Sequence, residues 1–75
     1  MVNAEEFIKE FKNFLESEGI IEMDTDLLDI DEWDSYSAMA FLEMIENKYG
    51  VKADPFSIAE AVLVEDLYKI VIEKK

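Results

Sequence analysis

Residues 31–50 read DEWDSYSAMAFLEMIENKYG, and the helix that they predict lies at the centre of the fold. From Ser35 onward, apolar residues recur every three or four positions and therefore share one helical face: Ala38, Phe41, Leu42, Ile45 and Tyr49. Asp34 and Ser35 are residue types that commonly cap the start of a helix. Gly50 can adopt the left-handed conformation that ends one. The pattern predicts an amphipathic helix over residues 35–49.

The same spacing of apolar residues occurs on both sides of this helix. Upstream it predicts a helix over residues 3–17 with the apolar face Ala4, Phe7, Ile8, Phe11, Phe14 and Leu15. We expect Gly19 to end this first helix. Downstream, Asp54-Pro55 predicts the start of a short helix over residues 55–61. A final helix begins near Val64, with Leu67, Tyr68 and Val71 on the same face.

These elements predict an all-α fold: a small bundle of three longer helices plus one short helix, with a long first loop. The chain of 75 residues has room for a single domain, residues 1–75, with one core. The expected core is Phe7, Phe11, Phe14, Leu15, Phe41, Leu42, Ile45, Leu67 and Val71. The loop covers residues 20–34, and its expected apolar anchors are Ile20, Ile21, Leu27, Leu28, Ile30 and Trp33.

The composition excludes several classes of function. The chain has 19 Asp and Glu against 7 Lys, with no arginine, and its formal net charge is -12. Such a surface repels phosphates, which excludes nucleic-acid binding through a basic patch. Because the chain has no cysteine and no histidine, it lacks a thiol nucleophile, an imidazole base and the usual nitrogen and sulfur metal ligands. We therefore expect a protein that is not an enzyme and has no catalytic residues of its own.

The sequence also bears on where the protein acts. The N-terminus has no basic flank followed by an apolar run, and no apolar stretch approaches the roughly 20 residues that a membrane span needs. We expect a cytoplasmic protein without a membrane span. A surface with so large a net charge repels its own copies, so we expect a monomer.

The acidic residues concentrate in one part of the chain. No basic residue lies between Lys12 and Lys48, whereas eleven acids do. This interval is either a solvated acidic face or a surface that attracts a basic partner. It fails the calcium-loop pattern, because a loop starting at Asp24 would place Leu28 at a ligand position and Ser35 where a glutamate is needed. We therefore expect no dedicated metal site.

The candidate functional residues lie where the acidic loop meets the helix of residues 35–49. Ser35 is expected at the helix N-terminus, where an anion is favourably bound, although Ser35 or Asp34 could simply cap the helix. The outward face of the helix carries Tyr36, Met39, Ala40 and Glu43, with Glu46 and Met44 at its margins. Apolar anchors within an acidic surround suit partner docking, although single exposed apolar residues are also common on surfaces that bind nothing.

The chain resembles the acyl carrier proteins, a family of phosphopantetheine-bearing carrier domains. The resemblance covers nearly all of the chain and rests on the long acidic loop, Asp34-Ser35 at a helix start, IENKYGV at that helix's end, and a short helix before VEDLYKIV. The chain departs from the family where Tyr36 replaces the usual leucine. Ser37 and Ala40 also stand at positions that are often acidic in fatty-acid carriers.

The resemblance implies that Ser35 bears 4'-phosphopantetheine, transferred from coenzyme A by a phosphopantetheinyl transferase. The cofactor thiol would carry an acyl or aminoacyl group as a thioester. The implied partners are that transferase, a loading ligase or acyltransferase, and a downstream synthase or transferase. Recognition would involve Asp34, Tyr36, Met39, Glu43 and Glu46. The alternative from the residues alone is an unmodified acidic helical adaptor that binds a basic partner protein.

Overall fold

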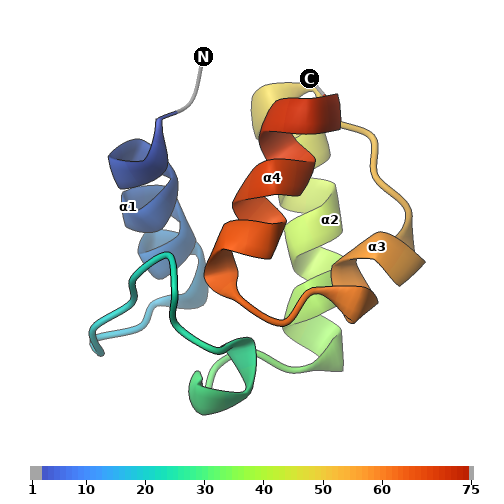
Figure 1. The fold of residues 1–75 in the computed structure, drawn as a ribbon. Helices are drawn as coiled ribbons and strands as arrows, with labels where there is room; N and C mark the ends of the chain where they lie inside the picture. Colours follow the sequence, from blue (N-terminus) through green and yellow to red (C-terminus); the bar gives the residue numbers. More distant parts are fainter. Residues whose placement is uncertain (1–2, 75) are drawn as a thin grey trace.

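The computed structural model describes residues 3–74, which form four α-helices and one short 3₁₀ helix (Figure 1). The elements in chain order are α1 (Ala4–Leu15), η1 (Leu27–Asp29), α2 (Ser35–Tyr49), α3 (Pro55–Glu60) and α4 (Val64–Lys74). The predicted all-α bundle of three longer helices and one short helix is confirmed. The short helix α3 packs against α2. None of the helices within residues 3–74 has both the length and the apolar character needed to cross a bilayer.

The helix boundaries follow the predicted signals except at the end of α1. This helix ends at Leu15 rather than near residue 17, and Gly19 does not end it. Glu16 adopts the left-handed conformation instead (φ 55°), and its N–H donates to the Asn13 carbonyl at 3.2 Å. The Ser17 N–H donates to the Lys12 carbonyl at 3.1 Å. These two bonds satisfy the Asn13 and Lys12 carbonyls in the last turn, and the helix ends where its apolar face ends, at the buried Leu15.

The other predicted boundary residues occupy the expected positions. Gly50 follows α2 in the left-handed conformation (φ 70°), where a side chain would be strained. Asp54 caps α3, its Oδ1 accepting from the Ser57 N–H at 2.9 Å, and Pro55 is the first residue of that helix. Proline costs no hydrogen bond there, because the first N–H groups of a helix have no intrahelical partner.

Aromatic rings fill the middle of the core. Phe7, Phe11 and Phe41 are each 0% exposed, and Phe41 meets Phe11 edge-on at a centroid distance of 5.7 Å. Seven of the nine predicted core residues are buried. The other two, Phe14 and Leu42, are only half-buried at the edge of the core, which corrects the prediction. The core also includes the loop anchors Ile21, Leu27 and Ile30 and the helix-face residues Ala38 and Val64. Val51 and Ile58 are buried too, and neither was predicted to belong to the core.

Backbone hydrogen bonds hold the long first loop against the segment that joins α3 to α4. The Leu27 N–H donates to the Val62 carbonyl at 2.9 Å, and the Val64 N–H donates to the Thr25 carbonyl at 3.0 Å. Ile21, Leu27 and Ile30 are buried, as expected of anchors. Ile20 and Leu28 are not anchors, because they are 85% and 90% exposed. The loop therefore presents some of its apolar side chains to solvent rather than to the core.

Candidate functional site

The start of α2 is built by a reciprocal pair of hydrogen bonds. The Asp34 Oδ1 accepts from the Ser37 N–H at 2.8 Å, and the Ser37 hydroxyl accepts from the Asp34 N–H at 2.8 Å. The Ser37 hydroxyl in turn donates to the Glu32 carbonyl at 2.9 Å. This capping box satisfies two backbone donors and ties the last turn of the acidic loop to the helix.

These hydrogen bonds lower the pKa of Asp34. The largest cause is the Ser37 N–H, followed by the Ser37 hydroxyl, and both favour the ionised carboxylate. Asp34 therefore stays ionised and held in place beside the first turn of α2. Its carboxylate is exposed, so solvent reaches the site from the same side.

Ser35 is the first residue of α2 and does not cap it. Its side chain is exposed, and within residues 3–74 its hydroxyl makes no hydrogen bond. Asp34 and Ser37 already perform the capping that the sequence could have assigned to Ser35. The Ser35 hydroxyl is consequently a free oxygen at the positive end of a helix of 15 residues.

A groove opens directly beside Ser35. It has a volume of about 480 Å³, and its walls come from η1, the start of α2, and α3. Its apolar lining consists of Leu28, Trp33, Ala38, Met39, Ile58 and Ala59. Ile58 is buried whereas Leu28 is exposed, so one side of the groove borders the core and the other side is open to solvent. Any group attached to the Ser35 oxygen would have apolar surface within reach.

The outward face of α2 presents the residues that the sequence singled out for partner recognition. Tyr36 is 83% exposed, Met39 is 45% exposed, and Glu43 and Glu46 are exposed. Tyr36, Met39 and Glu43, together with Ala40, line a second hollow of about 250 Å³. Asp34, the N-cap residue of α2, lies at the N-terminal end of this face. Met44, at the margin of this face, is half-buried and packs against the core.

Sequence reasoning missed part of the apolar surface near Ser35. Leu28 on η1 lines the groove together with Ser35. Val62, whose carbonyl accepts from Leu27, is also exposed and so lies close to η1. Phe56 on α3 is a third exposed apolar residue. The loop has no periodicity from which the outward direction of Leu28 could be deduced, and only the pairing of distant segments brings Val62 near it.

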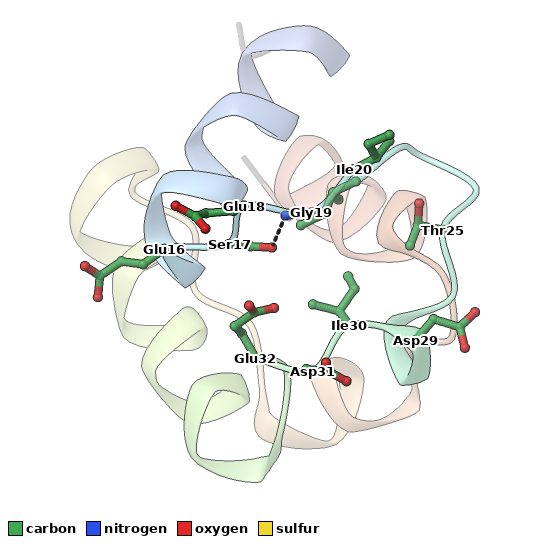
Figure 2. A pocket seen from close by; sticks show the side chains of 11 residues that line it. Glu16, Ser17, Glu18, Gly19, Ile20, Thr25, Asp29, Ile30, Asp31 and Glu32 are labelled. Atoms are coloured by element: carbon green, nitrogen blue, oxygen red, sulfur yellow. Dashed lines mark hydrogen bonds between the residues drawn. The ribbon is translucent and has the colours of Figure 1, made fainter.

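A separate hollow lies between the end of α1 and the acidic loop (Figure 2). It has a volume of about 420 Å³, and five carboxylates line it: Glu16, Glu18, Asp29, Asp31 and Glu32. Figure 2 shows Ile30 and Glu32 pointing into the hollow, whereas Glu16 and Asp29 point away from it. In the described part of the chain, no three carboxylates converge closely enough to hold a metal ion. These acids are therefore spread over a surface rather than gathered into one site.

Comparisons of this chain with protein-family models, with curated proteins and with solved structures gave no match. What the protein can do is therefore inferred from the geometry around Ser35.

Proposed function

We propose that this protein is a stand-alone carrier protein that bears 4'-phosphopantetheine on Ser35 and delivers an acyl or aminoacyl group to partner enzymes. The observation that supports this most directly is the exposed, unbonded Ser35 hydroxyl at the start of α2. Asp34 and Ser37 are committed to the capping box, so of the two serine hydroxyls in this turn only that of Ser35 is available for modification.

The surroundings of Ser35 fit the proposed group. A phosphodiester on the Ser35 oxygen would carry a negative charge, which the N-terminus of α2 favours. The apolar groove offers a resting surface for the flexible arm beyond the phosphate. With the group bound, its terminal thiol supplies the thioester chemistry that a chain without cysteine cannot supply.

Attachment is a phosphoryl transfer from coenzyme A. The Ser35 Oγ attacks the phosphorus that bears the pantetheine arm, a new O–P bond forms, and the phosphoanhydride bond breaks. The adenosine 3',5'-bisphosphate leaves with the bonding electron pair. A base on the transferase removes the hydroxyl proton, because no residue of this chain within residues 3–74 accepts a hydrogen bond from that hydroxyl.

The remaining residues of the site bind partners rather than perform chemistry. Tyr36 and Met39 provide apolar contacts, whereas Glu43 and Glu46 attract basic side chains. A tethered cargo then has a high effective concentration at whichever enzyme is docked. The cytoplasm, where coenzyme A and such enzymes occur, is the compartment that we propose.

The test is the intact mass of the protein after incubation with coenzyme A, magnesium and a broad-specificity phosphopantetheinyl transferase. We expect the wild type to gain one phosphopantetheinyl group and Ser35→Ala to gain none. Ser37→Ala is the matched control: it removes a hydroxyl from the same turn, and it should still gain the group. Circular dichroism of each variant checks that it remains helical.

The opposite result would favour the adaptor hypothesis. If a folded wild-type protein gains no mass with several transferases, the carrier proposal is wrong. The same acidic and apolar face would then bind a basic partner without modification, and Ser35→Ala would bind that partner as tightly as the wild type does.

A further inference from the structure

The space behind the Ser35 groove is filled by aromatic rings. Trp33, which forms part of the groove wall, lies 5.6 Å from Phe11 and 5.8 Å from Phe41 between ring centroids. Phe41 also contacts Phe7 at 6.2 Å in an edge-on arrangement. The three phenylalanines are fully buried, so the path from the groove into the bundle passes through closely packed rings.

Moving these rings would be unfavourable. Each ring has partners on more than one side, and adding atoms to a packed core forces side chains out of their preferred rotamers. The groove, in contrast, is open to solvent along the exposed Leu28. A group that extends from Ser35 therefore meets less resistance along the surface between α2 and α3 than toward the centre of the molecule.

We propose, on the basis of the proposed function, that the aromatic cluster of Trp33, Phe11, Phe41 and Phe7 keeps the cargo outside the bundle. The cargo rests in the open groove between η1, α2 and α3 and stays accessible to solvent. The substrate class that suits such a carrier is short or polar acyl and aminoacyl groups, because a long alkyl chain would leave most of its apolar surface in water.

The test compares carriers loaded with acetyl, butyryl, octanoyl and dodecanoyl groups from the corresponding acyl-coenzyme A. Two properties are measured: the thermal unfolding midpoint and the rate at which hydroxylamine cleaves the thioester. We expect both to be the same for all four chain lengths, because no cargo enters the core. A midpoint that rises with chain length, together with slower cleavage of the longer thioesters, would overturn the inference.

Two variants show whether the rings are the cause. Trp33→Ala removes the ring that separates the groove from Phe11 and Phe41, and in this variant we expect the dodecanoyl group to raise the unfolding midpoint and to slow cleavage. Phe56→Ala removes an exposed aromatic residue of α3 that does not line the groove, and it should behave like the wild type. If Trp33→Ala, folded by circular dichroism, also shows no dependence on chain length, the rings are not the barrier and the inference is wrong.

The mass spectrum separates this inference from the proposal on which it depends. If no group is added to Ser35, both are wrong and no loaded species exists to compare. If a group is added and the longer chains stabilise the wild-type protein, the carrier function stands and only the exclusion of cargo from the core is wrong.

Discussion

Among the individual side chains of residues 3–74, Tyr49 has a polar group that is buried without a hydrogen bond. Its hydroxyl oxygen is buried and has no hydrogen-bond partner within the described residues. An unsatisfied buried hydroxyl costs about 1–3 kcal/mol. We expect Tyr49→Phe to keep the ring packing and to raise the free energy of unfolding by roughly 1 kcal/mol, or about 4–8 °C in the thermal midpoint of a domain of this size.

Alkaline pH should enlarge the difference between Tyr49→Phe and the wild type. Burial raises the pKa of Tyr49, because the phenolate is poorly solvated there. Because the folded pKa is raised, the unfolded chain loses the phenol proton at a lower pH than the folded protein does. The stability of the wild type therefore falls as the pH rises from about 10 through the folded pKa, whereas that of Tyr49→Phe does not fall for this reason. Tyr36→Phe removes an exposed hydroxyl and should leave stability unchanged. A lower midpoint for Tyr49→Phe would mean that the hydroxyl has a hydrogen-bond partner after all.

The assignment of roles to Asp34, Ser35 and Ser37 shows where sequence reasoning about single residues stops. The sequence predicted a helix start at this point, and that prediction is confirmed. It could not choose between Asp34 and Ser35 as the capping residue, because both residue types cap helices equally well. The choice depends on which side chain lies within reach of the Ser37 N–H, and that distance is a property of the folded turn.

Among the helices, α2 depends on the ionised Asp34 at its start. Its lowered pKa means that the carboxylate stabilises the folded protein above about pH 4 and that this contribution disappears as the pH falls through the folded pKa. Asp34→Asn retains an oxygen that can accept from the Ser37 N–H but cannot be protonated in this range. We expect the thermal midpoint of this variant to fall less than that of the wild type between pH 5 and pH 2.

Asp24→Asn is the control for the loss of one negative charge. The Asp24 carboxylate accepts no hydrogen bond within residues 3–74, so this variant removes one negative charge and leaves every helix cap intact. Asp66 also has a lowered pKa, because its carboxylate accepts from the N–H groups of Leu63 and Val62 at the start of α4. Protonation of Asp66 should therefore account for stability that Asp34→Asn still loses at acid pH. If the thermal midpoints of Asp34→Asn and the wild type fall equally between pH 5 and pH 2, the ionised Asp34 does not stabilise the start of α2 as proposed.

The helices were predictable because their periodicity is local, whereas the loop depends on contacts between distant segments. The apolar pattern of residues 35–49, together with Asp34 before it and Gly50 after it, predicted the bounds of α2. The exposure of Ile20 and Leu28 could not be foreseen, because the loop's backbone bonds to Val62 and Val64 set which side chains face inward. The groove beside Ser35 has the same origin: its walls come from η1, α2 and α3, and only the packing of these elements against one another forms it.

For the molecule as a whole, the two ends of the bundle differ in charge. The lysines of the described helices lie in α1, near the end of α2 and in α4, whereas the segment that leads into α2 carries Asp29, Asp31, Glu32 and Asp34 and no lysine. Figure 1 places the start of α2 at the opposite end of the molecule from the start of α1 and the end of α4. A basic partner would therefore be attracted to the end that carries the proposed attachment site.

This asymmetry predicts how salt should affect the reaction at Ser35. The Debye length falls from about 10 Å at 0.1 M salt to about 3 Å at 1 M, so we expect the association rate of the transferase to fall steeply over this range. Glu43→Gln combined with Glu46→Gln should slow association several-fold at 0.1 M salt and make little difference at 1 M. Stopped-flow fluorescence of Trp33, close to Ser35, can follow the association.

A second pair of substitutions distinguishes local attraction from the effect of net charge. Glu5→Gln combined with Glu73→Gln also removes two negative charges, but from exposed positions in the first turn of α1 and the last turn of α4. If the face around Ser35 steers the partner, this pair should retain most of the wild-type association rate and its salt dependence. Equal slowing by both pairs would mean that only the total charge matters, and an association rate indifferent to salt would exclude the acidic face as the landing site.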